Sequence, residues 1–241
     1  MEVVCIGCGP GDPDLVTVRA ATLLKNADII FAPTAREGKP SIALSIVQKY
    51  LNAGVETVNL IFPMVKDREY TRQYWRKNAD QIVAAAKMGK KVVYITVGDP
   101  SLYSTWIYIQ REITSRYPEI RLIIIPGIPS VFAFAAQAKI SLAEGDETLG
   151  IIPACYDLDK VKRTADSCDT LVFLKDGRYF VDVINMLGDV GFSDESVITI
   201  AQDVSVGKEV LKRNNLKELR QNKETTEKYF SLMVAKRKNG R

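Results

Sequence analysis

The sequence predicts an α/β protein of two domains, with a five-stranded parallel sheet in the N-terminal domain, a five-stranded mixed sheet in the C-terminal domain and a cleft between them. In the first half, short apolar runs alternate with helical segments, and several runs are apolar on both faces, as in parallel strands covered by helices. In the second half, some neighbouring strand candidates are joined by connections too short for a helical crossover. Such connections favour antiparallel pairing.

The first domain is expected over residues 1–138. Its helical segments carry apolar residues at three- and four-residue spacing, and Ser41 is a suitable cap for the second of them. The expected strands are Val3–Gly7, Ile29–Ala32, Thr57–Phe62, Val92–Val97 and Arg121–Ile125. The expected helices are Leu15–Asn26, Ile42–Leu51, Tyr70–Met88, Tyr103–Tyr117 and Ser130–Ala138.

The second domain is expected over residues 139–241, with the irregular, polar segment Lys139–Thr148 as the linker. Helical spacing is clearest over Arg178–Leu187, and the short connection Gln202–Lys208 predicts an antiparallel pair. The expected strands are Leu149–Pro153, Thr170–Leu174, Val197–Ala201, Glu209–Lys212 and Tyr229–Ala235.

Composition indicates an ordinary globular chain with 46% hydrophobic residues in 241. No apolar run is long enough for a membrane span, and the N-terminus enters a predicted strand at once, so no signal peptide is expected. A cytoplasmic location follows by elimination. The net charge of +4 is mild, and no basic stretch is interleaved with aromatic residues, which argues against nucleic-acid binding. The basic residues Lys236, Arg237, Lys238 and Arg241 are interpreted as a solvated tail.

Histidine is absent, which excludes Ser-His, Cys-His and His-ligated metal mechanisms for this chain. Cys5 and Cys8 form a C-x-x-C pair, but Cys155 and Cys168 do not supply a second one. The cysteines are therefore expected to be small apolar filler, and no metal site is predicted.

Three glycine-containing turns follow predicted parallel strands: Gly7–Pro13, Gly98–Ser101 and Pro126–Ser130. Ligands of open parallel sheets bind outside the carboxyl ends of the strands, so these turns are expected to converge on one site. The first turn lacks the third glycine of a dinucleotide fingerprint, because Asp12 stands in its place, and no P-loop pattern follows. A plain strand-to-helix turn capped by Asp12 or Asp14 is the alternative for it.

The second turn suits a zwitterionic or cationic ligand, because it offers a carboxylate and exposed backbone amides at a strand end. G-x-G-P-G-D-P, G-D-P-S-L-Y-S-T and P-G-I-P-S together resemble the tetrapyrrole methylase family, the class III S-adenosylmethionine methyltransferases. The resemblance covers essentially the whole chain. Within the family, Phe62–Met64, Leu102–Thr105 and Tyr229–Leu232 resemble the members that methylate C20 of precorrin-2 or of cobalt-precorrin-2 in cobalamin synthesis.

The resemblance implies a homodimer with S-adenosylmethionine bound in the trough between the domains and S-adenosylhomocysteine as the product. It implies cofactor contacts from the three turns and from strand ends of the second domain. The residues in these positions are Pro10, Gly98, Asp99, Leu102, Ser104, Thr105, Ser130, Val131, Leu174, Ala201 and Gln202. Family members often carry Met-Gly near Leu174, whereas this chain has Leu174-Lys175-Asp176-Gly177, which puts the adenine contacts in doubt.

A tetrapyrrole substrate carries many carboxylates, so basic residues are expected around its site. Arg36 and Lys39, in the loop after the second strand, are the candidates for binding it. Arg68, Arg72 and Arg76 share one stripe of the next long helix, where a solvated face is the alternative.

No catalytic base stands out, and Tyr103 and Glu144 are weak candidates. Three other activities stay open: methyl transfer to another corrin position, to uroporphyrinogen, or to the modified histidine of elongation factor two. A non-catalytic tetrapyrrole or nucleotide sensor is the alternative from a different class.

Overall fold

The computed structural model describes the chain except residues 66, 154–156, 175–179, 203–209, 222–231 and 239–241. It consists of two compact units, Met1–Ser130 and Val131–Arg241. The predicted boundary lies after residue 138, so the structure moves helix α5 (Ser130–Ala138) into the second unit except for its first residue. Strand–helix alternation alone assigned this helix to the first domain, whereas the division into compact units places Val131–Ala138 in the second. The predicted cleft between the domains stays a prediction.

The first unit contains a five-stranded sheet in the order β3-β2-β4-β1-β5, and every neighbouring pair is parallel. This confirms the predicted parallel sheet. Because all five strands run the same way, their carboxyl ends lie along one edge, which we call the carboxyl edge. The strands are β1 (Glu2–Gly7), β2 (Ile29–Thr34), β3 (Glu56–Ile61), β4 (Val92–Thr96) and β5 (Arg121–Ile125).

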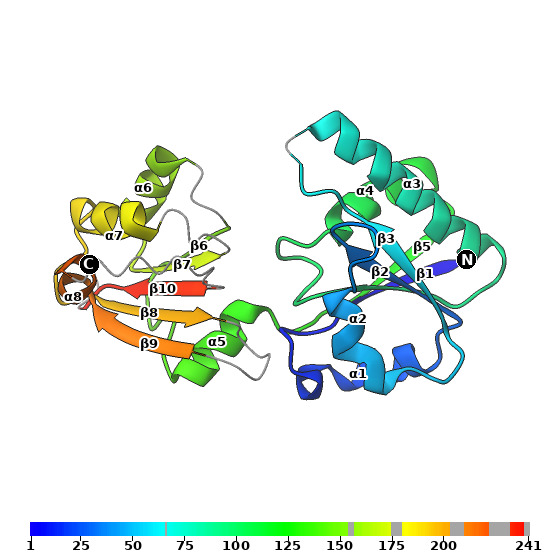
Figure 1. The fold of residues 1–241 in the computed structure, drawn as a ribbon, viewed down its shortest axis with the longest axis horizontal. Coiled ribbons are helices and arrows are strands. Elements are labelled where there is room, and N and C mark those ends of the chain that lie inside the picture. Colours follow the sequence, from blue (N-terminus) through cyan, green and yellow to red (C-terminus); the bar gives the residue numbers. More distant parts are fainter. Residues whose placement is uncertain (66, 154–156, 175–179, 203–209, 222–231, 239–241) are drawn as a thin grey trace. The chain divides into compact units, whose positions relative to one another are not determined.

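Helices cover both faces of this sheet (Figure 1), as the two-sided apolar strands predict. Alternate residues of β1 show the division: Val3 and Cys5 pack on one face with α3 and α4, and Ile6 packs on the other with α1 and α2. The helices are α1 (Val18–Lys25), α2 (Ile42–Val47), α3 (Arg68–Lys87) and α4 (Trp106–Arg116), with short 3-10 turns η1 (Pro13–Leu15) and η2 (Gln48–Tyr50).

The two cysteines of the C-x-x-C pair are fully buried and belong to different clusters, Cys5 to the α3–α4 face and Cys8 to the α1–α2 face. Burial raises the pKa of both thiols, to about 12 for Cys8. This confirms the filler interpretation for these two, while Cys155 lies outside the described residues. Within the described part of the chain, no group of residues could hold a metal ion.

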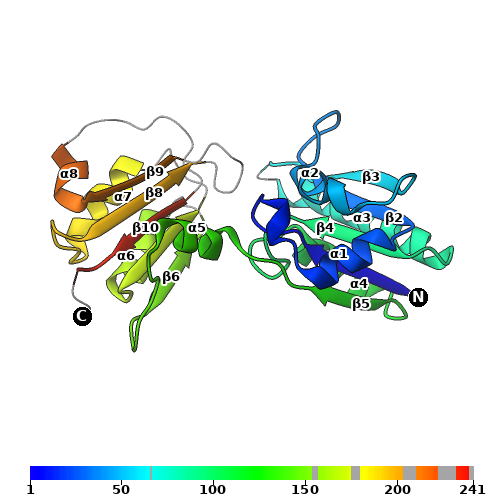
Figure 2. The ribbon, with the colours of Figure 1, turned by 90° about the horizontal axis from the view of Figure 1, so that it is seen from below.

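The second unit contains a mixed sheet in the order β6-β7-β10-β8-β9. Strands β6 and β7 pair in parallel, whereas β10 is antiparallel to both β7 and β8, and β8 is antiparallel to β9. Figure 2 shows β8, β9 and β10 together. The mixed sheet and the antiparallel pair are as predicted. The strands are β6 (Leu149–Ile152), β7 (Thr170–Leu174), β8 (Val197–Gln202), β9 (Val210–Asn215) and β10 (Leu232–Lys236).

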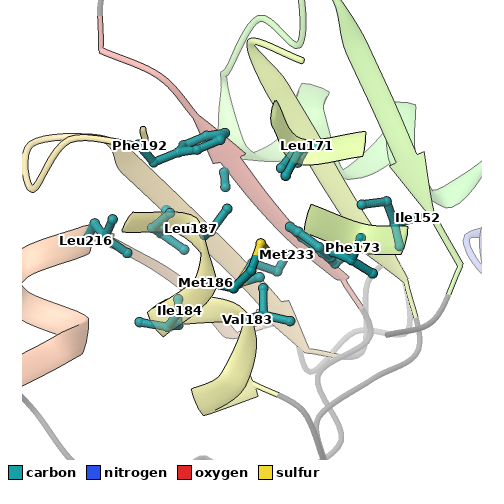
Figure 3. Close-up of a cluster of buried hydrophobic side chains, with 14 of the residues drawn as sticks. Ile152, Leu171, Phe173, Val183, Ile184, Met186, Leu187, Phe192, Leu216 and Met233 are labelled. Atoms are coloured by element: carbon teal, nitrogen blue, oxygen red, sulfur yellow. The ribbon is translucent and has the colours of Figure 1, made fainter. Parts of the chain in front are cut away.

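The core of the second unit forms where α7 packs on the sheet (Figure 3). Val183, Met186 and Leu187 of α7 meet strand residues such as Phe173 and Met233. The other helices are α6 (Leu158–Asp166) and α8 (Leu216–Gln221), and α7 itself spans Phe180–Asp189. Asp157 caps α6 by accepting a hydrogen bond from the Lys160 amide at 3.0 Å. Among the described helices, none is both long and apolar enough to cross a membrane.

The prediction of a solvated basic tail is wrong for Lys236 and Arg237, whereas Lys238 is exposed as predicted. Lys236 ends strand β10 and binds Glu147 at 2.8 Å, and Lys238 pairs with Glu195 at 3.4 Å on the surface. Arg241 lies outside the described residues.

Arg237 departs furthest from that prediction. Its guanidinium lies over the Phe192 ring, 4.3 Å from the centroid, and donates hydrogen bonds to carbonyl oxygens at the ends of α6 and α7. These carbonyls belong to Ala165, Cys168, Val190 and Gly191. A planar group with five donors can satisfy several helix-end carbonyls at once, so Arg237 joins two helices.

Candidate functional site

The first glycine turn leaves β1 as a tight strand-to-helix connection. Gly9 has a φ of 77°, which favours glycine, and the Asp12 carboxylate accepts a hydrogen bond from the Asp14 amide at 2.8 Å to cap η1. The structure thus selects Asp12 as the cap. The turn is held from outside by η2, because Tyr50 donates to the Pro13 carbonyl at 2.8 Å and Lys49 binds Asp14.

The second glycine turn is joined to the first by backbone hydrogen bonds. The Gly98 amide donates to the Gly9 carbonyl at 2.7 Å, and the Gly9 amide donates to the Gly98 carbonyl at 3.2 Å. Gly98 has a φ of 71°, a conformation that side chains rarely adopt. Two loops far apart in the sequence therefore lie edge to edge beyond the sheet.

The third turn passes so close to the other two that only glycine fits at the contacts. A Cβ atom at Gly7 would lie 2.6 Å from both the Gly127 amide nitrogen and the Gly98 carbonyl oxygen, and one at Gly127 would also overlap the Gly98 carbonyl. Real Cβ contacts are essentially never this short, so the backbones must pack without side chains. The predicted convergence of the three turns on one site is confirmed.

The Asp99 carboxylate links the second turn to the third. Its Oδ2 accepts a hydrogen bond from the Gly127 amide at 2.9 Å, and its Oδ1 accepts from the Ser101 amide at 2.8 Å and from the Ser101 hydroxyl. Partial burial favours a higher pKa for Asp99, but these hydrogen bonds to the charged form outweigh burial and hold its pKa below the usual value. Asp99 is therefore an anion at neutral pH that fixes two loops together.

Ser104 and Thr105 fasten the second turn to strand β4 through their hydroxyl groups. The Ser104 hydroxyl lies 2.9 Å from the Thr96 hydroxyl, and the Thr105 hydroxyl lies 2.7 Å from the phenol of Tyr94, which is fully buried. Burial raises the pKa of the Tyr94 phenol and keeps it neutral. This geometry favours an indirect role for Ser104 and Thr105, in which they position the loop backbone that a ligand would meet.

Tyr103 lies between these anchors with its backbone in the left-handed region, at a φ of 51°, and its side chain is exposed. Such a conformation in an aromatic residue is strained, and strain of this kind is found at functional sites. Partial burial raises the pKa of its phenol, so Tyr103 suits donation of a hydrogen bond better than removal of a proton. Its neighbour Leu102 is half-buried.

The other residues predicted to bind the cofactor or the substrate differ in how far their side chains are exposed. Pro10 is buried and Ser130 is half-buried, and Val131, the first residue of the second unit, is fully buried, so any contact from it would come through its backbone. Arg36 and Lys39 are exposed in the loop after β2. The structure thus places Pro10, Arg36, Lys39 and Ser130 at or beyond the carboxyl edge.

The arginine stripe on α3 contacts another helix instead of lying free. Arg72 and Arg76 approach the carboxylate of Glu112 on α4 at 3.8 Å and 3.7 Å, and Arg116 approaches it at 3.7 Å. Trp75 stacks on Tyr108 beside them, with ring centroids 4.1 Å apart. Arg72 and Arg76 therefore stabilise the α3–α4 pair.

The second unit brings its strand-end candidates together at one edge of its sheet. Leu232 of β10 pairs with Leu174 on one side and with Ala201 on the other, so the carboxyl ends of β7 and β8 lie one strand apart. Gln202 follows Ala201 in β8, and its side chain lies outside the described residues, as do Lys175, Asp176 and Gly177. Leu174 and Ala201 are buried.

Glu144 lies in the loop before β6 and approaches Lys236 at 3.8 Å. Its backbone amide donates to the Glu147 carboxylate at 2.8 Å. An ion-paired surface glutamate has no evident feature of a catalytic base, and its role stays a prediction.

The comparisons with known proteins agree with this geometry. A sequence profile of the Tetrapyrrole (Corrin/Porphyrin) Methylases matches residues 2–220. The chain belongs to this family. Among tetrapyrrole methylases, a probable cobalt-precorrin-2 C(20)-methyltransferase of Methanocaldococcus jannaschii is 40% identical over 174 residues, which are 72% of each chain. The cobalt-precorrin-2 C(20)-methyltransferase of Salmonella typhimurium is 37% identical over 190 residues, 79% of each chain.

A solved tetrapyrrole methylase shows the same fold. The uroporphyrin-III C-methyl transferase of Thermus thermophilus, in complex with S-adenosylhomocysteine, superposes with a TM-score of 0.71 at 18% identity. The match covers 98% of this chain and 97% of the other. At this identity the likeness concerns the fold alone.

Proposed function

We propose that this chain is an S-adenosylmethionine-dependent methyltransferase that methylates C20 of precorrin-2 or of its cobalt complex in cobalamin synthesis. The observation that carries this proposal is the 40% and 37% identity to two proteins named for that reaction. The geometry supports it, because the three glycine turns whose motifs resemble this family meet at the carboxyl edge of the first unit.

The residues at the carboxyl edge fit the proposed cofactor. Addition of a Cβ at Gly98 would meet only Pro129, at 3.8 Å, so the backbone there is open to a ligand. The neighbouring Asp99 supplies a negative charge that complements a sulfonium and an ammonium group. Pro10, Gly98, Asp99, Leu102 and Ser130 would hold the cofactor in the first unit, with Ser104 and Thr105 positioning the loop. The proposed contributors from the second unit are Val131, Leu174, Ala201 and Gln202.

S-adenosylmethionine would supply an already activated methyl group, which agrees with a chain that lacks histidine. The chain would contribute mainly proximity and orientation, effects worth roughly 7–11 kcal/mol in favourable cases. The loops suit this task because Asp99, Ser104 and Thr105 fix them from within. Tyr103, whose side chain is exposed, would donate a hydrogen bond to the substrate, and the ring proton would leave to water.

Arg36 and Lys39 are proposed to bind substrate carboxylates. Thr34, at the end of β2, holds their loop by donating its hydroxyl to the carbonyls of Arg36 at 3.2 Å and of Lys39 at 2.9 Å. Neither side chain has an ion pair among the described residues, which leaves both cations available to an acidic ligand.

Uroporphyrinogen, or another position of the corrin ring, is the second candidate acceptor, and the likeness to a uroporphyrin-III methyltransferase supports it at the level of fold. A homodimeric assembly and a cytoplasmic location complete the proposal. Light scattering after size-exclusion chromatography tests the first, and fractionation of the source cells tests the second.

The direct test supplies the purified chain with S-adenosylmethionine and, separately, precorrin-2, cobalt-precorrin-2 and uroporphyrinogen. We expect a single added methyl on precorrin-2 or its cobalt complex by mass spectrometry, placed at C20 by NMR. A methyl placed elsewhere would reassign the position within the family. Tight S-adenosylhomocysteine binding in calorimetry without turnover of any of the three would favour a sensor instead.

A further inference from the structure

Exposed apolar side chains and exposed cations follow neighbouring strands at one corner of the carboxyl edge. Met64 and Val65 follow β3 and are 88% and 51% exposed, and Ile42 begins α2 and is 67% exposed. We define the β2–β3 corner as these three residues together with Arg36 and Lys39. Surfaces seldom leave several large apolar side chains exposed at one place unless something covers them.

The backbone brings the two halves of the corner together. Strands β2 and β3 are parallel neighbours, with Thr34 opposite Ile61 at their carboxyl ends. The Phe62 amide donates to the Thr34 carbonyl at 2.8 Å, which extends the pairing one step beyond the strands. The segment that carries Met64 therefore leaves the sheet beside the loop that carries Arg36.

The loop between β2 and α2 is formed in advance of any ligand. Its ends are held by the buried Thr34 hydroxyl, and the Lys39 amide donates to the Arg36 carbonyl at 3.3 Å across the turn at Gly38, whose φ is 72°. Glu37 contributes one negative charge, so the loop keeps a net positive charge. A loop fixed in this way can hold two cations in place at little entropic cost.

We infer that the β2–β3 corner receives the edge of the tetrapyrrole ring, with Ile42, Met64 and Val65 against its apolar face and Arg36 and Lys39 on its carboxylates. The inference rests on the proposed function and adds the apolar residues as determinants of substrate binding. The combination of apolar side chains and cations favours a tetrapyrrole as the ligand. A flat apolar ring edged with carboxylates needs apolar surface and cations side by side. A second copy of this chain would bring the same positive loop against itself.

The first experiment replaces the apolar pair, as Met64→Ser/Val65→Ser, and compares it with Met88→Ser. Met88 is a matched control, because it is 76% exposed and lies at the carboxyl end of α3, at the opposite edge of the sheet. We expect the KM for the tetrapyrrole to rise about tenfold in the double variant, with kcat and S-adenosylhomocysteine affinity within about twofold of wild type. Met88→Ser should change none of the three.

The second experiment uses salt to distinguish the contribution of the cations to substrate binding from that of the apolar side chains. Arg36→Ala/Lys39→Ala should raise the tetrapyrrole KM at low salt, and this effect should shrink at about 0.5 M NaCl because charge interactions are screened. The effect of Met64→Ser/Val65→Ser should persist there. Lys25→Ala/Lys77→Ala is the control, since both lysines are exposed and neither has an ion pair among the described residues.

The outcomes distinguish this inference from the proposed function. A wild-type chain that methylates no tetrapyrrole overturns the proposed function, and direct binding of uroporphyrin, followed by its fluorescence, then tests the corner alone. An active wild type with an unchanged KM in the Met64→Ser/Val65→Ser variant overturns the inference and leaves the function intact. A change of oligomeric state in that variant, seen by light scattering, would assign the corner to a second copy and overturn the inference as well.

Discussion

The two units of this methylase fix their loops by different means. At the carboxyl edge of the first unit, backbone groups of Gly7, Gly98 and Gly127 meet directly, and no side chain fits at Gly7 or Gly127. In the second unit, a long side chain joins the segments, because Arg237 donates hydrogen bonds to carbonyls at the ends of two helices and covers the Phe192 ring. Backbone contacts leave the edge open to a ligand, whereas side-chain contacts fill the space that they stabilise.

The largest expected effect comes from adding one methyl group where the three loops meet. Gly127→Ala would place a Cβ 2.7 Å from the carbonyl carbon and oxygen of Gly7 and closer still to the Gly98 carbonyl, so the loops must separate. We expect S-adenosylhomocysteine affinity to fall by about a hundredfold or more, measured by calorimetry.

Gly54→Ala is the control for Gly127→Ala. Gly54 has a φ of 85° but open space around it, so its substitution strains the backbone without a collision. We expect it to lower the free energy of unfolding by about 1 kcal/mol and to leave cofactor affinity unchanged. Equal binding losses in the two variants would show that the close approach of the loops has no special importance.

The second effect tests the side-chain contacts of the other unit. Arg237→Ala removes the donors to four carbonyls, and we expect the free energy of unfolding to fall by about 3 kcal/mol in urea denaturation. Arg237→Lys should recover less than half of the loss, because an ammonium group cannot reach several carbonyls in one plane. Lys238→Ala, which removes only a surface ion pair, should stay within about 0.5 kcal/mol of wild type. A small effect of Arg237→Ala would contradict the contrast between the units.

The smallest effect concerns the carboxylate that links two of the glycine loops. We expect Asp99→Ala to weaken S-adenosylhomocysteine binding about tenfold in calorimetry. Asp99→Asn should weaken it less, because the amide oxygen can still accept from Ser101 while the amide nitrogen cannot accept from Gly127. An unchanged affinity in Asp99→Ala would remove Asp99 from the cofactor site.

The same carboxylate predicts a pH dependence of stability. The folded protein holds the pKa of Asp99 below its unfolded value of about 3.9, so its contribution is complete above that pH and is lost as the pH falls through the folded pKa. The stability difference between wild type and Asp99→Ala should therefore be present at neutral pH and should shrink in acid. A difference that grows in acid would contradict this assignment.

The parallel sheet could be predicted from sequence because each of its strands carries its own local signal. Val92–Thr96 is an almost unbroken apolar strand, and Arg121–Ile125 was predicted with the bounds that the structure shows. The convergence of the glycine turns followed from topology alone, since carboxyl ends of parallel strands share one edge. Helix α6 could not be told from a turn by sequence, because Leu158–Asp166 is short and mostly charged.

The contacts within the site could not be predicted, because they join residues that are distant in the sequence. Nothing local to Asp99 shows that its carboxylate accepts from Gly127, and the alternation of Tyr94 and Thr96 in an apolar strand was the only signal of the hydroxyl groups beneath the second turn. Arg237 was misread for the same reason. A basic residue near a chain end resembles a solvated tail until the helix ends that it satisfies are placed beside it.

The crowding of three backbones at Gly7, Gly98 and Gly127 also has a consequence for protein engineering. A library that randomised Gly7 and Gly127 would consist almost wholly of unfolded or ligand-free variants, because even the smallest side chain collides there, and at Gly98 the φ of 71° strains any side chain. The side chains of the β2–β3 corner are exposed, so their replacement should alter substrate binding and leave the fold intact. An engineer who wants a new acceptor for this scaffold should therefore keep the inner ring of glycines and diversify the outer loops.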